Sequence, residues 1–157
     1  MKFLTILMYH YVREIKNSQF PKIKGLEFKE FKNQIKNLEK KYQFLDYEEF
    51  SYFTQNKKKL PKNSCILTFD DGYKDHIKYV VPELLKRKIK GFFFPSAKAV
   101  LENSILDINY IHLIISKCSN ELDLINDLNF LLIKNGFTNK ELKLYFKKYA
   151  ISTRYDS

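Results

Sequence analysis

The stretch ILTFDDGYKDH, residues 66–76, runs from an apolar segment into two adjacent carboxylates and a glycine. The apolar residues before Asp70 are typical of a buried strand, so the two aspartates stand where that strand ends. Two neighbouring negative charges repel each other, which costs stability. A bound cation or a reaction would explain the pair, and Gly72 would let the backbone turn sharply or approach a ligand closely.

A helix cap is the alternative explanation for these carboxylates. Asp70 or Asp71 could cap a helix that starts at Tyr73, and capping is the more common role of an isolated Asp-Asp-Gly sequence. One cap needs only one aspartate, however. In the chemical interpretation, one carboxylate binds a cation while the other takes a proton from water.

Apolar runs on both sides of this stretch predict two further strands. Residues 3–9 (FLTILMY) suit a strand buried on both faces, as in a parallel sheet, and residues 64–69 and 91–96 also read as buried strands. The segments between them have helical spacing. We expect helices over 28–42, from a capping box of Asp46 and Glu49 through Phe53, after Gly72, and over 82–88. This alternation predicts an α/β fold with a parallel sheet.

The helix after Gly72 is predicted to place Tyr73, Ile77 and Val80 on one face. Beyond residue 100 the pattern becomes all helical, with no further strand. Asp107 can cap a helix that carries isoleucines at 108, 111 and 115. A second helix is expected over 121–133, ended by Gly136, and a third over 139–149.

Polar side chains follow each of the three predicted strands. His10 follows the first, Asp70 and Asp71 the second, and Ser96 the third. Because chemistry in parallel α/β folds gathers beyond the carboxyl ends of the strands, we expect these groups to converge on one rim.

The composition is that of a globular domain with a basic surface. The chain has 157 residues and a net charge of +10, but only Arg13, Arg87 and Arg154 are arginines. Arginine is the usual reader of guanine edges, and the lysines are scattered, so the one tight run at 57–62 is interpreted as a solvated loop and no nucleic acid is expected. Cys65 and Cys118 fit no metal spacing, and Cys65 reads as a buried thiol.

The amino terminus resembles a signal peptide only superficially. His10 and Arg13 interrupt its apolar run, and no small-residue cleavage site follows. No segment reaches the ~20 apolar residues of a membrane helix. We therefore expect a soluble cytoplasmic protein without a membrane partner.

Thr68 to Tyr73, with the MYHYV opening and GFFFPS, resemble the polysaccharide deacetylase family, of the NodB-homology, carbohydrate esterase 4 type. The resemblance covers roughly residues 2–100. It implies a distorted (β/α) barrel and metal-dependent removal of an acetyl group from an N-acetylated sugar. In that family Asp70 would be the general base and Asp71 a ligand of a divalent metal, usually zinc. His10, Gly72, Tyr73 and Ser96 are candidates for lining the site.

The histidine content departs from the family pattern. The family supplies two more metal ligands from a His-x-x-x-His motif, but this chain has only His10, His76 and His112, and no pair has that spacing. We expect His76 to be a surface or packing residue and His112 to be in the core or partly buried. One aspartate alone would hold zinc weakly, so little activity is expected of this chain by itself.

Chain length leads to the same expectation, because a complete barrel of this sort takes ~250 residues. We expect residues 1–100 to form the amino-terminal part of a barrel and residues 101–157 a helical insertion, incomplete at its C-terminus, in a truncated chain. The alternative is a non-catalytic module or half of a split enzyme, completed by a partner chain that supplies the missing ligands. A phosphate-handling α/β protein of the receiver type fits less well, because its acidic pair would end the first strand, where His10 stands here.

Overall fold

The computed structural model describes residues 3–149. The chain divides into two compact units, Met1–Lys117 and Cys118–Ser157, which are described separately below. No helix among the described residues is long and apolar enough to cross a membrane. The assignment of residues 101–157 to an insertion stays a prediction, and its last eight residues lie outside the described part.

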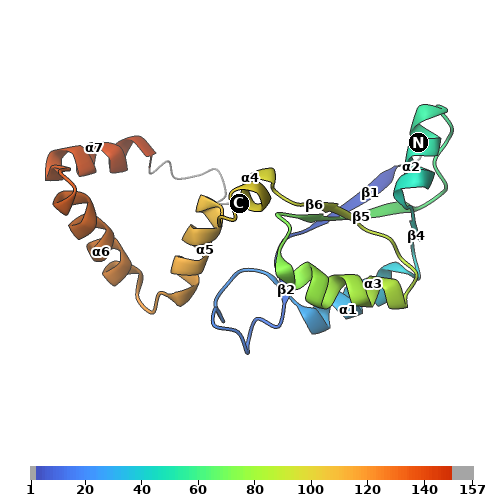
Figure 1. Cartoon of the computed structure of the whole chain (residues 1–157), viewed down its shortest axis with the longest axis horizontal. Coiled ribbons are helices and arrows are strands. Elements are labelled where there is room, and N and C mark those ends of the chain that lie inside the picture. Colours follow the sequence, from blue (N-terminus) through green and yellow to red (C-terminus); the bar gives the residue numbers. More distant parts are fainter. Residues whose placement is uncertain (1–2, 150–157) are drawn as a thin grey trace. The chain divides into compact units, whose positions relative to one another are not determined.

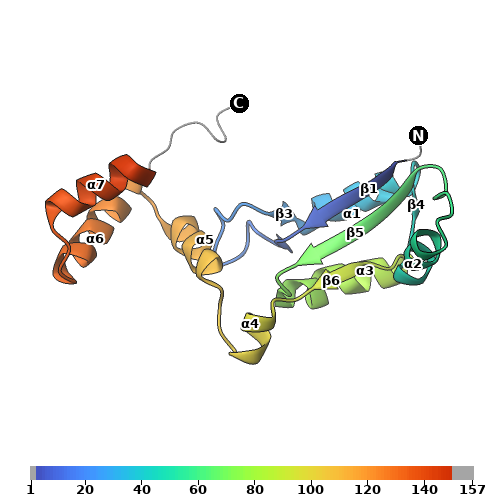
Figure 2. The same ribbon diagram turned by 90° about the horizontal axis from the view of Figure 1, so that it is seen from above.

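A parallel sheet forms the centre of the first unit. Strand β1 (Leu4–Tyr9) pairs along its full length with β5 (Ser64–Asp70), and the two run side by side in Figure 2. The other edge of β5 pairs with β4 (Gln43–Phe44) at its start and with β6 (Phe92–Phe94) at its end. The predicted α/β class and parallel pairing are confirmed.

Three two-residue strands were not predicted from the sequence. They are β4 and the parallel pair of β2 (Val12–Arg13) and β3 (Leu26–Glu27). Two residues are too few to show the alternation by which a strand is recognised, so these strands follow from tertiary pairing rather than local pattern.

One face of the sheet is covered by helices. In Figure 1, α1 (Phe28–Leu38) and α3 (Val81–Lys86) lie on the same side of β1, β5 and β6. Phe31 and Ile35 of α1 and Leu84 of α3 pack with Leu67 and Phe69 of β5 in one buried cluster. Helix α1 ends four residues earlier than predicted, and Tyr42 packs against the cluster from the segment that follows.

The opposite face of the sheet is exposed along β1 and β6, although Ile66 of the central strand β5 is buried. Ile6 and Met8 of β1 are 57% and 64% exposed, and Phe94 of β6 is 54% exposed. Successive residues of a strand point to opposite faces, and the core helices all cover the face of Leu67 and Phe69. The prediction that the first strand is buried on both faces was therefore wrong, and so was the prediction that the third is a buried strand.

The helix after Gly72 differs from its predicted form. It opens as a π-helical turn, His76–Val80, which runs directly into α3 with Pro82 in its first turn. The wider π turn changes which side chains face inward. His76 and Val80 are buried, whereas Ile77, predicted on the buried face, is 71% exposed.

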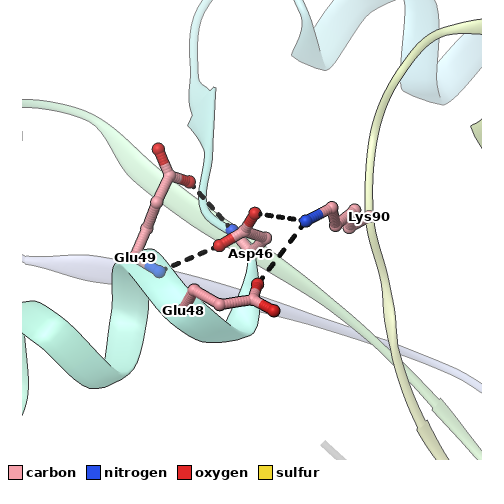
Figure 3. A network of polar contacts seen from close by, with 4 residues as sticks. All are labelled: Asp46, Glu48, Glu49 and Lys90. Atoms are coloured by element: carbon pink, nitrogen blue, oxygen red, sulfur yellow. Dashed lines mark hydrogen bonds and ion pairs between the residues drawn. The ribbon is translucent and has the colours of Figure 1, made fainter.

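Helix α2 (Tyr47–Gln55) begins at the predicted capping box (Figure 3). The Glu49 amide donates to Asp46 Oδ1 at 2.9 Å, and the Asp46 amide donates to Glu49 Oε2 at 3.0 Å. Lys90, which precedes β6, bonds to Asp46 Oδ2 at 2.8 Å and lies 3.5 Å from Glu48. These contacts connect the N-terminus of α2 to the segment that leads into β6.

The last two helices of the first unit are α4 (Ala97–Leu101) and α5 (Asp107–Lys117). Helix α5 forms where predicted, but it buries Asn109 and Ser116. Its isoleucines at 108, 111 and 115 are each about half exposed.

The second unit contains two helices among its described residues. These are α6 (Glu121–Lys134) and α7 (Asn139–Tyr149), both close to their predicted ranges. Gly136 follows α6 with a φ of +94°, in agreement with its predicted role as the helix end. No residue of α6 is buried within the described structure.

Candidate active site

The ends of β1 and β5 bring His10 and Asp70 together. Tyr9 is aligned with Phe69 across the two strands, so the next residue of each chain segment stands at the same rim. His10 Nε2 lies 3.9 Å from Asp70 Oδ2, and both side chains are partly exposed. The pair is close enough for charge attraction when the imidazole is protonated, and it confirms the predicted convergence of these two strand ends.

Asp71 and Gly72 make the sharp turn that follows β5. Both have left-handed backbones, with φ of +68° and +67°. A Cβ on Gly72 would lie 2.7 Å from Pro95 Cβ and 3.0 Å from Pro95 Cα. The backbone at Gly72 therefore approaches Pro95, just beyond β6, and only glycine fits there without strain.

Neither aspartate takes the capping role considered for it. Lys74 and Asp75 are already helical, and Asp75 makes no side-chain cap bond where the π turn begins at His76. Asp71 Oδ2 instead accepts a hydrogen bond from the Tyr73 hydroxyl at 2.6 Å. Asp75 forms an ion pair with Arg13, with Nε and Oδ2 3.0 Å apart.

Tyr73 connects Asp71 to a second aromatic residue. Its ring stacks on Tyr11, with centroids 4.4 Å apart. Burial raises the pKa of the Tyr73 hydroxyl far above its ordinary value, and the hydrogen bond to Asp71 raises it further. Tyr73 therefore keeps its proton and acts as a donor to the carboxylate.

Helix α5 contributes Asn109 to the same cluster. Its Oδ1 lies 2.8 Å from the Tyr73 hydroxyl and 3.2 Å from the Tyr11 hydroxyl. The Tyr11 hydroxyl also lies 3.3 Å from His112 Nδ1. His112 is nevertheless exposed, so the expectation of a core or partly buried histidine was wrong; its isoleucine neighbours on α5 are themselves half exposed and provide no core.

A cavity of about 480 Å³ lies over this cluster. Asp71, Gly72 and Tyr73 line it from the strand end, and residues 103–106, 109 and 113 line it from α5 and the loop before it. Its lining does not include Asp70, His10 or Ser96. The two aspartates thus share a rim but face different surroundings, and Ser96 stands at the N-cap position of α4 without a side-chain cap bond.

His76 is a packing residue, as predicted. It is almost fully buried, and its ring lies against Phe69, Tyr73 and Phe93. Its Nε2 lies 2.6 Å from the His10 carbonyl oxygen, and burial lowers the pKa of the imidazole. The neutral ring donates from Nε2 and so holds the backbone at His10 in place.

Asp71, the predicted metal ligand, has too few other donor side chains near it among the described residues. Within residues 3–149 no group of three or more His, Cys, Asp and Glu side chains is arranged to hold a metal ion. One oxygen of Asp71 already accepts from Tyr73. Zinc sites use three or four protein ligands, so the described residues do not fit a complete zinc site.

Sequence reasoning did not identify Tyr11 and Asn109. Tyr11 belongs to the MYHYV opening, which contributed to the family resemblance but gave Tyr11 no role, and it lies beyond the strand predicted over 3–9. Asn109 stands in an isoleucine-rich helix. The only sequence feature that could have indicated its role is its polar side chain, which lies on the side of the helix that proved to be buried.

Comparison with known proteins identifies similar chains. The family model described as polysaccharide deacetylase matches residues 57–127. A Bacillus subtilis (strain 168) protein, YxkH, named by inference as a polysaccharide deacetylase, is 38% identical over 100 residues, which are 62% of this chain and 33% of that protein. This chain therefore spans about a third of the length of that relative.

Two solved structures have a similar fold. IcaB from Ammonifex degensii is 28% identical with a TM-score of 0.52, over 63% of this chain and 40% of that one. The Streptococcus pyogenes deacetylase PplD, solved in complex with acetate, is 23% identical with a TM-score of 0.51, over 73% of this chain and 51% of that one.

Proposed function

We propose that this chain, which is similar to polysaccharide deacetylases, carries part of a carbohydrate deacetylase site, which hydrolyses the N-acetyl group of a sugar. The observation that carries this proposal is the placement of His10, Asp70 and Asp71 at the paired ends of β1 and β5. The parallel sheet with helices on one face supports a partial (β/α) barrel, with the helices beyond residue 100 as its insertion.

Asp70 is the general base in this proposal. Its carboxylate is partly exposed and stands beside His10, so it is open to a water molecule at the rim. The carboxylate form of Asp70 is the form that accepts a proton from water. His76 contributes by holding the His10 carbonyl from the buried side.

Asp71 is the proposed ligand of a divalent metal, with zinc as the expected ion. When bound, such an ion would supply a polarising charge at the reacting carbonyl. The described residues offer one carboxylate for it, and we propose that the remaining ligands come from histidines outside the 157 residues of this polypeptide. This chain alone would then hold zinc weakly and have negligible activity.

The alternative proposal is a non-catalytic module or a split enzyme with a partner chain. The exposed face of the sheet supports it, because Ile6, Met8 and Phe94 present apolar surface where further strands of a barrel would pack. Co-expression with a chain that carries His-x-x-x-His should then give a soluble, metal-loaded complex. A soluble monomer that captures no such chain would contradict the split-enzyme version.

Acetate release tests the main proposal. Purified 1–157 should release no acetate from an N-acetylated sugar oligomer above a zinc-only blank. Zinc-dependent release by this chain alone would overturn the proposal that its site is incomplete.

A further inference from the structure

We propose that Asn109 is a positioning residue for the Asp71 carboxylate and acts through the Tyr73 hydroxyl. The purpose of that positioning rests on the proposed function, whereas the hydrogen-bond arrangement can be tested without it. Asn109 is buried on α5, far along the chain from the end of β5, and a buried amide needs hydrogen-bond partners.

The single proton of the Tyr73 hydroxyl determines which groups of this cluster donate hydrogen bonds and which accept them. Its hydroxyl has one proton but lies close to two oxygens, Asp71 Oδ2 at 2.6 Å and Asn109 Oδ1 at 2.8 Å. An ionised carboxylate has no proton to donate, so Tyr73 must donate to Asp71. The Tyr73 oxygen then turns only lone pairs toward Asn109, and a carbonyl oxygen at that distance would repel them.

The amide of Asn109 resolves this conflict when it is rotated by half a turn. The two ends of an amide have nearly the same shape, so neighbouring protons determine which end faces the phenols. With Nδ2 in the place of Oδ1, its two hydrogens match the two phenol oxygens of Tyr73 and Tyr11. The Tyr11 proton is then available for His112 Nδ1.

This arrangement fixes the direction of every bond in the cluster. Asn109 donates to Tyr73, and the Tyr73 proton is directed to Asp71 Oδ2, which lies 2.6 Å away, in preference to the neutral Tyr11 hydroxyl. One carboxylate oxygen is thereby held, and the other is left for a ligand or water. In the reverse arrangement Tyr73 would donate to Asn109, and the oxygens of Tyr73 and Asp71 would stand 2.6 Å apart with no proton of Tyr73 between them.

Side-chain amide NMR of the full chain, labelled with ¹⁵N-asparagine, tests the inference. In the parent protein both Nδ2 hydrogens of Asn109 should exchange slowly with water. Tyr73→Phe should speed the exchange of one hydrogen about tenfold, the factor expected for the loss of one hydrogen bond. Tyr11→Phe should do the same for the other hydrogen.

Asp71→Asn and Asp70→Asn complete the test as a matched pair. Asp71→Asn should shift the Asn109 amide resonances through Tyr73, whereas Asp70→Asn should leave them in place. Unchanged Asn109 resonances in both Tyr73→Phe and Asp71→Asn would overturn the inference. Because no substrate is present, a chain without deacetylase activity would still give the predicted resonances if Asn109 has this role.

Discussion

Replacing Gly72 by alanine should strongly destabilise the first unit. The backbone there has a φ of +67°, which costs an L-residue ~1–2 kcal/mol. The added Cβ would also lie 2.7 Å from Pro95 Cβ and 3.0 Å from Pro95 Cα, too close for any real contact. Forcing a methyl group into such a site costs a further ~1–3 kcal/mol, so the expected loss is ~2–5 kcal/mol.

Gly136→Ala provides the matched control. Gly136 also has a positive φ, of +94°, but among the described residues no atom beyond its chain neighbours lies within 4 Å of an added Cβ. Gly136→Ala should therefore lose only the ~1–2 kcal/mol of unfolding free energy that a left-handed backbone costs an L-residue. Urea unfolding of the full chain, followed by amide resonances of 3–117 for one variant and 118–149 for the other, measures both. The reasoning would be refuted if Gly72→Ala lost no more stability than Gly136→Ala.

Three further predictions concern the core, the capping box and the buried histidine. Phe31→Ala should lose ~3–5 kcal/mol of unfolding free energy, because the ring is fully buried, whereas Phe94→Ala on the exposed face should lose much less by the same urea assay. Asp46→Ala should lower the thermal midpoint by removing the cap of α2, and the exposed partner change Lys90→Met should lower it less in the same thermal scan. His76 has a folded-state pKa below its ordinary value of 6.5, so the unfolded chain takes up a proton first as the pH falls. The stability associated with its neutral form is therefore complete above about pH 6.5 and declines below it; thermal midpoints across this range should fall less steeply in His76→Asn, and equal slopes would contradict the prediction.

The sequence indicated the two long strands, and the polar residues that follow them, because an apolar run and the residues at its end are local features. The run before Asp70 is long and apolar, and the parallel pairing of β1 and β5 then places His10 beside Asp70. Which face of a strand is covered depends on long-range packing, so the exposure of Ile6 and Met8 could not be read from their apolar character.

The missed features of the site have the same physical origin. The π turn at His76 depends on packing against Phe69 and Phe93 and leaves no mark in helical periodicity. The polar cluster around Asp71 joins residues 11, 73 and 109, and nothing in the local sequence at 109 predicts that contact.

Acetate release by a chimera most directly tests the claim that this chain carries the base and one ligand of a deacetylase site. In the chimera, the matched residues of this chain replace their 100 counterparts in the Bacillus subtilis relative, and the unaltered relative serves as the reference. With zinc and an N-acetylated sugar oligomer, the chimera should release acetate as the reference does, and Asp70→Asn or Asp71→Asn should each abolish it. Acetate release that survives either substitution would contradict the account.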